Sequence, residues 1–536
     1  MWDVVIAGGQ VIDGAGNPWV HADLALSGGR IGAVGEGLRH EPAHRRIDAA
    51  GLIVCPGFVD MHTHSDIQLL GTPTHEAKVM QGVTLEVLGQ DGLGVAPLSD
   101  ECIELVRSQL QAINGDPPNV HWDWRRFGEY LDAFDGKVAT NVASYVGHGT
   151  VRMNVMGMEQ RPPTEGELTA MQTIIDQAMR DGAVGLSTGL TYPPGMFASD
   201  DEIVTLCSAI RRYGGVYCTH HRSYGAGALQ AYQDSIEIGR QAEVPVHLAH
   251  AQLSFPVNKG RGRALLGLVD QARRDGVDVT MDTYPYAAAS TFLRAIFPAW
   301  AHAGGEAALL GRLRDSATRQ RLRHEIEVEG TDGAHGVPVD WSLMQLGGLS
   351  LPQHQEFVGL RVPEAAARTG QPPFDWVCDL LIAERLGGVI VWHIGDEENV
   401  RTIMHHPAHT VGSDGVLVGD LPHPRAWGTF ARYLDTYTRE LGLFTWEEII
   451  RKMTSLPAQI LGLRDRGLLR PGMAADVVCF DPLRVRDTAT YEQPRAFPEG
   501  IPYVFVNGVA VKDQDRHTGN LPGQALRRGQ HGRSDR

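Results

Sequence analysis

Between about residues 55 and 415, short apolar runs alternate with longer segments of helical periodicity. This alternation is typical of βα units that build a parallel sheet. Nine runs qualify as strands: 59–63, 83–89, 142–146, 183–187, 216–219, 244–249, 277–282, 389–393 and 410–413. A closed (β/α)8 barrel has eight places, and we expect 389–393 to lie outside it. The predicted fold class is α/β, a TIM-like (β/α)8 barrel over residues 55–464.

Both ends of the chain have a different pattern from the middle. Residues 1–54 contain short strand-like runs separated by turn residues, and a similar pattern returns over 465–512. Neither piece is large enough to fold alone, so we predict that they pair into one small β-sandwich. An Arg-rich stretch over about 291–350 interrupts the barrel pattern and predicts a rim insertion. Residues 513–536 are polar and Gly-rich, and we expect them to be poorly ordered.

Composition narrows the function. The formal net charge of -16, without a dense Lys/Arg stripe, argues against nucleic-acid or anionic-membrane binding. No secretory signal pattern and no run of about 18 apolar residues occurs. The six cysteines lie far apart without C-x-x-C spacing, which suits buried thiols in a reducing compartment. We expect a cytoplasmic protein that acts on a small molecule and could form a homo-oligomer.

Histidine and aspartate side chains stand where several of the predicted strands end. His62 and His64 are two residues apart, so on a strand they point to the same face. His220, His250 and Asp414 follow later apolar runs. Because catalytic groups of such barrels come from the carboxyl ends of different strands, we expect these side chains to converge. Histidine nitrogens suit zinc and its neighbours, and together with carboxylates they fit one metal with open positions or two neighbouring metals.

A second metal would need a bridging anion. Related sites often use a carbamylated lysine for this, but the lysines of this chain do not stand at suitable strand ends. Asp91, flanked by Gln90 and Gly92 past the second strand, is the best candidate, and Glu86 within that strand is its rival. His148 ends the third strand, where an indirect role is as plausible as metal binding. His221 should face away from His220. Asp414 could both bind metal and accept a proton from a water molecule.

Several long motifs carry a resemblance to a known family. They are PGFVDMHTHSD (56–66), GAVGLSTGLTYPPG (182–195), YCTHHRSYG (217–225), DTYPYAAAST (282–291), GSDG (412–415) and HPRAWGTF (423–430). With them the chain resembles the amidohydrolase superfamily and, within it, the N-acyl-D-amino-acid deacylase (D-aminoacylase) family, from Val4 to about Leu526.

The resemblance implies a metal centre with one or two Zn²⁺ ions. His62, His64 and Asp414 would form one metal position, and His220 and His250 the other. Asp91 stands where better known members have a cysteine. Aspartate is a harder ligand than cysteine, which puts the number and tightness of the metals in question.

The resemblance also implies the substrate contacts. Arg425 would pair with the substrate carboxylate, with Tyr284 and Ser290 as further donors. Tyr192 would lie over the reacting carbonyl. His423, in the same motif as Arg425, is counted with the substrate-binding residues, as is Gln252, which stands where well-studied deacylases have a lysine.

The implied reaction is hydrolysis of the amide bond of an N-acyl-D-amino acid, which gives a carboxylate and a free D-amino acid. Asp414 would move the proton from water to the leaving nitrogen, and Tyr192 would stabilise the oxyanion. A cyclic amidase of the hydantoinase or dihydroorotase kind, or a hydrolase of another amide, is the nearest alternative. A deaminase is less favoured, and a non-catalytic scaffold that has lost its metal is the remote alternative.

Overall fold

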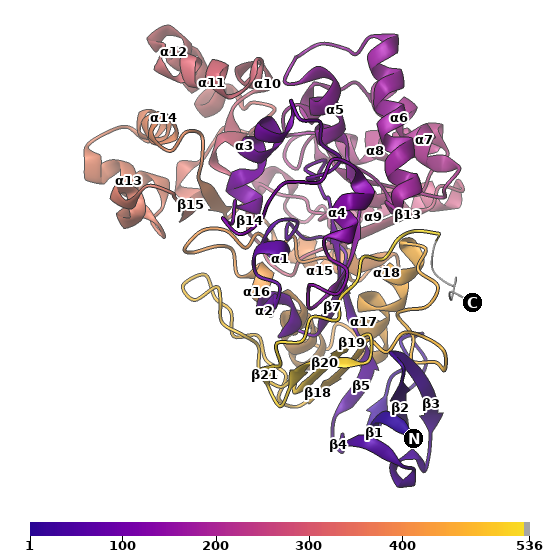
Figure 1. Cartoon of the computed structure of the whole chain (residues 1–536). Coiled ribbons are helices and arrows are strands. Elements are labelled where there is room, and N and C mark those ends of the chain that lie inside the picture. Colours follow the sequence, from indigo (N-terminus) through magenta and orange to yellow (C-terminus); the bar gives the residue numbers. More distant parts are fainter. Residues whose placement is uncertain (530–536) are drawn as a thin grey trace.

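A computed structural model describes residues 1–529 (Figure 1). Its centre is a ring of parallel strands. They are β6 (Phe58–Asp60), β7 (Val83–Leu88), β8 (Asn141–Ser144), β9 (Val146–Gly147), β10 (Gly185–Gly189), β11 (Val216–His220), β12 (Val246–Leu248), β13 (Val279–Thr283) and β17 (His409–Val411). β8 and β9 share one place, separated by Tyr145. The Val184 amide donates to the Ser144 carbonyl (3.0 Å) and the Met61 amide to the Val411 carbonyl (3.2 Å), which closes the ring.

Helices follow most of these strands and cover the outside of the barrel (Figure 1). They are α1 (Gln68–Gly71), α2 (Glu76–Val79), α3 (Ile103–Asn114), α4 (Phe127–Asp132), α5 (His148–Met156), α6 (Glu165–Asp181), α7 (Asp200–Arg211), α8 (Ala228–Ala242), α9 (Gly262–Arg274), α15 (Glu397–Met404), α16 (Arg425–Arg432), α17 (Trp446–Met453) and α18 (Ser455–Ile460). The α/β fold with a parallel sheet is confirmed.

Helix α6 shows how the sequence sets these boundaries. Thr164 and Glu167 form a capping box, in which each side chain accepts a hydrogen bond from the other residue's backbone amide. Gly182 ends the helix at φ 116°, a conformation that favours glycine. The buried side chains of Met171 and Ile175 lie one turn apart, so a single apolar stripe packs against the barrel.

Strands from both ends of the chain join in one nine-stranded sheet beside the barrel (Figure 1). They are β1 (Trp2–Val11), β2 (Val20–Ser27), β3 (Arg30–Gly35), β4 (Ala43–Asp48), β5 (Ile53–Pro56), β18 (Val477–Phe480), β19 (Tyr503–Val506), β20 (Val509–Asp513) and β21 (Arg516–His517). β5 pairs antiparallel with β18, with Cys55 opposite Val478. Leu24 and Val477 lie in the same apolar core, so each end of the chain buries the other.

A separate three-stranded sheet lies between β13 and β17 in the chain. β16 (Val389–Trp392) pairs antiparallel with β14 (Ala289–Phe292) and β15 (Met344–Gly348), so the prediction that 389–393 lies outside the barrel is confirmed. The helices of this region are α10 (Ala299–His302), α11 (Gly305–Arg314), α12 (Ser316–His324), α13 (Val362–Thr369) and α14 (Pro373–Ala383).

This rim region has its own apolar core, which includes Phe297, Leu346 and Val377. It extends from 289 to 392 rather than over 291–350, because β16 returns to complete the sheet that β14 and β15 begin. Ile394, two residues after β16, belongs to the same core, so we call residues 289–394 the rim insertion.

The end of the described chain is attached to the barrel. The Leu526 amide donates to the Val142 carbonyl (2.7 Å), and the side chains of Ala525 and Leu526 are buried. Residues 513–529 therefore depart from the predicted poor order, because their few apolar side chains cover the edge of β8. Residues 530–536, the remainder of that prediction, lie outside the described residues.

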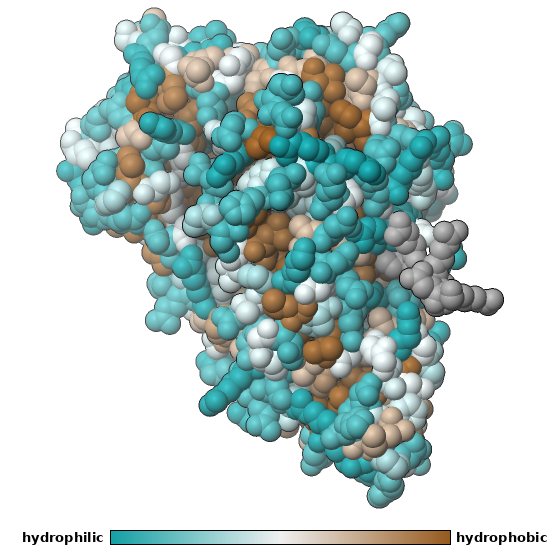
Figure 2. Space-filling view, viewed as in Figure 1, coloured by the Kyte–Doolittle hydropathy of each residue, from teal (hydrophilic) through white to brown (hydrophobic). Residues whose placement is uncertain are grey.

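Polar side chains dominate the face of the molecule in Figure 2, and apolar groups form scattered patches. Within residues 1–529, no helix is both long and apolar enough to cross a membrane.

Candidate metal centre and active site

The predicted metal ligands all come from the carboxyl ends of barrel strands. His62 and His64 follow β6, His220 is the last residue of β11, and Asp414 follows β17. β6 and β17 hold each other in register, because the Asp414 amide donates to the His62 carbonyl (2.8 Å). Asp91 follows β7 with φ 55°, an unfavourable backbone conformation for a residue with a side chain, and Asp414 has φ 49°. Such strain is often found at functional sites.

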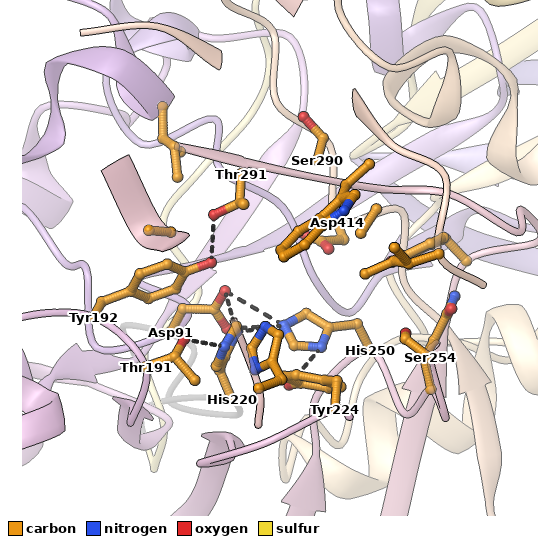
Figure 3. Close-up of a pocket in the computed structure, with 18 of the residues that line it drawn as sticks. Asp91, Thr191, Tyr192, His220, Tyr224, His250, Ser254, Ser290, Thr291 and Asp414 are labelled. Carbon is orange, nitrogen blue, oxygen red and sulfur yellow. Dashed lines mark hydrogen bonds and ion pairs between the residues drawn. The ribbon is translucent and has the colours of Figure 1, made fainter. Parts of the chain in front are cut away.

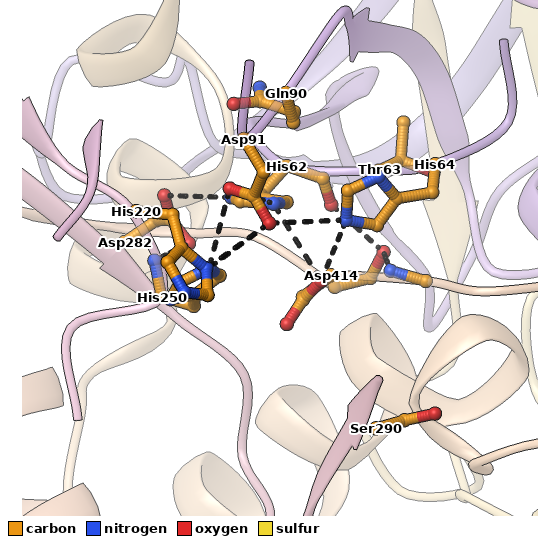
Figure 4. Close-up of polar contacts among 12 residues, drawn as sticks. His62, Thr63, His64, Gln90, Asp91, His220, His250, Asp282, Ser290 and Asp414 are labelled. Carbon is orange, nitrogen blue, oxygen red and sulfur yellow. Dashed lines mark hydrogen bonds and ion pairs between the residues drawn. The ribbon is translucent and has the colours of Figure 1, made fainter. Parts of the chain in front are cut away.

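Asp91 is the centre of this arrangement (Figure 4). Its Oδ1 lies 3.5 Å from His62 Nε2 and 3.4 Å from His250 Nε2. Its Oδ2 lies 3.5 Å from His64 Nε2 and 3.4 Å from His220 Nδ1. One carboxylate thus faces four imidazoles.

These residues form two groups with metal-binding geometry, one of His62, His64, Asp91 and Asp414, the other of Asp91, His220 and His250. The six residues together are the Asp91 cluster, and Asp91 belongs to both groups. Within residues 1–529, Asp91 Oδ1 and both ring nitrogens of His62 are buried without a hydrogen-bond partner. A buried polar atom without a partner costs about 1–3 kcal/mol, and a cation bound between these atoms would remove that cost. The chain therefore has a cluster of residues that fits a metal ion.

The carboxylates and imidazoles of the Asp91 cluster shift one another's pKa values. Burial raises the pKa of Asp91, but the neighbouring imidazoles of His250, His62 and His220 outweigh burial and hold this pKa well below its usual range. Burial lowers the pKa of His62, but the nearby carboxylates of Asp91 and Asp282 outweigh burial and raise this pKa well above its usual range. Asp91 therefore remains a carboxylate, the form that binds metal.

Three further side chains orient the histidines, and the sequence reasoning missed them. Tyr224 Oη lies 3.0 Å from His250 Nδ1, and Thr191 Oγ1 lies 2.6 Å from His220 Nε2, so in each imidazole the other nitrogen faces Asp91. Asp282, at the end of β13, accepts a hydrogen bond from the His250 amide (3.0 Å) and lies 3.8 Å from His62 Nδ1. Asp282 also ends a predicted strand, so the rule that found His220 could have found it.

Gly189 makes room for this arrangement. A side-chain carbon at Gly189 would lie 2.0 Å from the Asp91 carbonyl oxygen and 3.0 Å from the ring of Tyr192. Only glycine permits this close approach. The 182–195 motif, which contains β10 and Tyr192, can therefore pack against the loop that carries Asp91.

A second buried polar cluster lies beside the first. Lys78 Nζ donates to Asp60 Oδ2 (2.6 Å) and Ser413 Oγ (2.6 Å). Asp60 also accepts from the Ser413 amide (2.8 Å) and from the Ser413 hydroxyl (2.6 Å). We call Asp60, Lys78 and Ser413 the Lys78 cluster. It joins the end of β6 to the loop that carries Asp414.

Glu86, the rival of Asp91, points elsewhere. It accepts hydrogen bonds from Ser65 (2.8 Å) and Thr140 (2.9 Å) and forms an ion pair with His75 (2.8 Å). Burial raises the pKa of Glu86, but His75 outweighs burial and lowers this pKa to about 2. Glu86 is thus held away from the Asp91 cluster by partners of its own.

Two other histidines also lie outside the cluster. His148 Nε2 lies 3.1 Å from Glu202 Oε1 in a buried group that includes Arg152. The ring of His221 packs between Tyr224 and Tyr232, with ring centroids 4.0 Å and 3.8 Å away. Both histidines contact neighbouring structural elements rather than the metal positions.

A cavity opens onto the Asp91 cluster (Figure 3). Its lining includes four of the predicted substrate-binding residues: Tyr192, Gln252, Tyr284 and Ser290. Tyr192 Oη lies 2.8 Å from Thr291 Oγ1, and its ring lies 4.7 Å from the ring of His220. Burial raises the pKa of Tyr192 far above neutrality, so its hydroxyl keeps its proton and can donate.

Arg425 and His423 lie behind the cavity wall. Arg425 Nη1 lies 2.8 Å from Asp414 Oδ2, its Nη2 donates to the Ser290 carbonyl (3.2 Å), and its guanidinium lies 4.5 Å from the centre of the Tyr284 ring. His423 Nε2 donates to the Ala288 carbonyl (3.0 Å), and its Nδ1 accepts from the Arg425 amide (3.0 Å). His423 therefore differs from the prediction of a substrate contact, because both its ring nitrogens hold the start of α16 in place.

A parallel barrel with histidine and carboxylate groups gathered at the carboxyl ends of its strands defines the class of metal-dependent barrel hydrolases. The family model described as the Amidohydrolase family matches residues 45–512, and the chain belongs to this family. The family resemblance predicted from the motifs is thus confirmed.

Characterised relatives match over nearly the whole chain. The D-aminoacylase of Alcaligenes xylosoxydans xylosoxydans is 36% identical over 536 residues, covering 98% of each chain. A solved D-aminoacylase with a binuclear metal center has 35% identity and a TM-score of 0.83, covering 98% of this chain and 100% of the other. The N-acyl-D-glutamate deacylase of Bordetella bronchiseptica, solved with zinc and a phosphonate inhibitor, has 33% identity and a TM-score of 0.83, covering 98% and 99%.

Proposed function

We propose that this chain hydrolyses the amide bond of N-acyl-D-amino acids and releases a carboxylate and a free D-amino acid. The observation that carries the proposal is the Asp91 cluster at the floor of a cavity, with hydroxyl donors of Tyr192, Tyr284 and Ser290 in the same lining. The match to D-aminoacylase over 98% of both chains supports the same reaction.

The metal is proposed to be zinc. His62, His64 and Asp414 would hold one ion and His220 and His250 the other, with Asp91 shared between them. Nitrogen and carboxylate donors without cysteine suit zinc and its neighbours in the first transition series. Zinc at such a position lowers the pKa of a water ligand toward 7 and polarises a carbonyl oxygen.

Asp414 is proposed to move the proton. Within the Asp91 cluster, its Oδ1 lies 3.1 Å from His64 Nε2. Burial raises the pKa of Asp414, but Arg425 and the nearby histidines outweigh burial and lower it well below its usual range. Asp414 is therefore ionised at neutral pH, ready to accept a proton and then donate it to the leaving nitrogen, which departs as the neutral amine.

Tyr192 and the groups around Arg425 are proposed to bind the substrate. The Tyr192 hydroxyl would donate to the developing oxyanion. Ser290 Oγ is buried without a hydrogen-bond partner within residues 1–529, so it is free to donate to the substrate carboxylate. Arg425 lies behind Ser290 and Tyr284 and would add its positive charge to this end of the cavity. His423 would act through Arg425, by holding its backbone.

The test combines metal analysis with release of free amine from paired N-acetyl-D- and N-acetyl-L-amino acids. We expect bound zinc and D-selective release. Asp414→Asn should reduce turnover by roughly 10²–10⁴-fold, the usual contribution of a general acid and base. Asp420→Asn, an exposed carboxylate on the same loop, should leave turnover unchanged. Near-normal turnover in Asp414→Asn, or hydrolysis confined to cyclic amides, would contradict the proposal. The cytoplasmic location and the homo-oligomer stay predictions from the sequence.

A further inference from the structure

We propose that the enzyme prefers N-acyl-D-amino acids with uncharged side chains over those of D-aspartate and D-glutamate. The inference rests on the proposed function and adds the identity of the side-chain subsite. That subsite is formed by four of the residues that the rim insertion contributes to the cavity lining: Ala295, His335, Trp392 and Ile394. We call these four residues the rim wall.

The first argument is the charge of the lining. Within residues 1–529, the cavity is lined by no lysine or arginine, and its acidic residues are Asp91 and Asp414. The guanidinium of Arg425, behind the wall, is already shared between Asp414 and the Ser290 carbonyl. A substrate with a second carboxylate would bury that charge without a cation, at a cost of several kcal/mol. The cavity therefore disfavours acidic side chains.

The second argument is the chemistry of the rim wall. The His335 ring lies among aromatic rings, with centroids 5.5 Å from Tyr224, 5.8 Å from Phe255 and 6.1 Å from Trp392. Burial lowers the pKa of His335 to about 3, so the ring is neutral at physiological pH. Together with Ile394, these rings present an apolar surface with one neutral imidazole, which suits an aliphatic, aromatic or amide side chain.

His335 is held rigidly in this position. Its carbonyl accepts hydrogen bonds from the Ala226 amide (3.0 Å) and the Ser223 hydroxyl (3.3 Å), both in the loop after β11. The same loop carries Tyr224, which orients His250. His335 is thus connected to the metal centre through the loop that carries Tyr224, and a bulky substrate group would meet a preformed surface there.

The third argument places the amino-acid side chain, rather than the acyl chain, against the rim wall. Ser290 and Ala289 are neighbours on β14, and Ala289 stands directly opposite Trp392 of β16. Side chains opposite each other on paired strands lie about 4.5–5.5 Å apart. Ser290 and Trp392 both line the cavity, so the proposed carboxylate donor and the rim wall meet in the same lining. Because the carboxylate and the side chain of an amino acid share one carbon, a carboxylate at Ser290 directs the side chain toward Trp392.

The test compares substrates that differ in charge but hardly in shape. We expect kcat/KM for N-acetyl-D-glutamine to exceed that for N-acetyl-D-glutamate by at least about 100-fold, from one unpaired buried charge. N-acetyl-D-leucine and N-acetyl-D-phenylalanine should be hydrolysed at least as well as the glutamine compound. Equal values for the glutamine and glutamate compounds would overturn the inference while leaving the proposed function intact. Hydrolysis of none of them would overturn both.

An acyl series distinguishes the two ends of the substrate. With D-leucine constant, changing N-acetyl to N-succinyl should reduce kcat/KM by much less than changing D-glutamine to D-glutamate. The reverse order would place the acyl group at the rim wall and overturn the assignment.

A gain-of-function variant adds an independent test. Ala295→Lys places a cation on a half-buried position of the rim wall, and it should raise the glutamate-to-glutamine ratio of kcat/KM by about tenfold or more. Ala303→Lys, on the same rim but outside the cavity lining, is the matched control and should leave the ratio unchanged. Thermal unfolding should first show that the Ala295→Lys variant is folded. If it is folded and its glutamate-to-glutamine ratio of kcat/KM is unchanged, the substrate side chain does not lie against the rim wall.

Discussion

The Asp91 cluster and the Lys78 cluster are built from similar material, yet their hydrogen bonding is opposite. Both are buried, and both lie where β6 and β17 end. In the Lys78 cluster, Asp60 uses both carboxylate oxygens, toward Lys78 and toward the amide and hydroxyl of Ser413. In the Asp91 cluster, within residues 1–529, one oxygen of Asp91 and both nitrogens of His62 have no hydrogen-bond partner.

The contrast distinguishes a buried polar cluster that stabilises the fold from one that binds a ligand. A buried network whose members are all satisfied rigidifies its surroundings, while a half-satisfied one is costly unless something binds there. The Lys78 cluster thus holds the frame, and the Asp91 cluster, supported by that frame, offers its free atoms to a ligand. Substitutions in the two clusters should therefore have different consequences.

The largest effect is expected in the Asp91 cluster. Asp91→Asn removes the negative charge shared by both groups of ligands, so metal content should fall at both positions and activity by more than about 100-fold. Metal content is measured by mass spectrometry after dialysis, and activity by amine release. Asp123→Asn, an exposed carboxylate, is the control. Full occupancy of both positions in Asp91→Asn would break the distinction between the two clusters.

The next effect concerns stability rather than metal. Lys78→Met leaves the Asp60 carboxylate buried without its cation, which should lower the free energy of unfolding by about 3–5 kcal/mol. Denaturant unfolding of the metal-free protein measures this, and Asp91→Asn should cost less under the same conditions. The double variant Lys78→Met/Asp60→Asn should recover part of the loss. A loss below about 1 kcal/mol would remove the structural role of this cluster.

The smallest effect sharpens the comparison within the Asp91 cluster. Tyr224→Phe removes the hydroxyl that lies 3.0 Å from His250 Nδ1, and groups of this kind contribute about 10–100-fold to metal affinity. Competition with a chelator should show weaker binding at one position, with unfolding little changed. Tyr213→Phe, far from the cluster, provides the control. Equal weakening at both positions would mean that Tyr224 acts on more than His250.

The sequence predicted the parts of the site that depend on chain order. Strand ends in a parallel barrel meet at one face, so His62, His220 and Asp414 could be expected to converge from their places after apolar runs. The sequence favoured Asp91 over Glu86 but could not exclude Glu86, because that choice depends on which way a buried strand residue points. Glu86 faces Ser65 and His75, and only the folded chain shows those partners.

The residues that were missed or assigned another role have the same explanation. Tyr224 and Thr191 act from loops whose paths no local pattern describes, and His423 turns toward Ala288 because of the fold around α16. The extent of the rim insertion was also hidden, since β14 and β16 are separated by nearly a hundred residues of the chain. Pairings at this distance have no local signal in the sequence.

The separate apolar core of the rim insertion has an evolutionary consequence. Because β14, β15 and β16 form a sheet of their own and pack around residues such as Phe297 and Val377, mutations there need not disturb the barrel. Substitutions in the rim insertion can thus change the substrates that are bound, while the Asp91 cluster stays unchanged. Chains that share this hydrolytic centre could therefore acquire different substrate specificities through changes in the rim insertion alone.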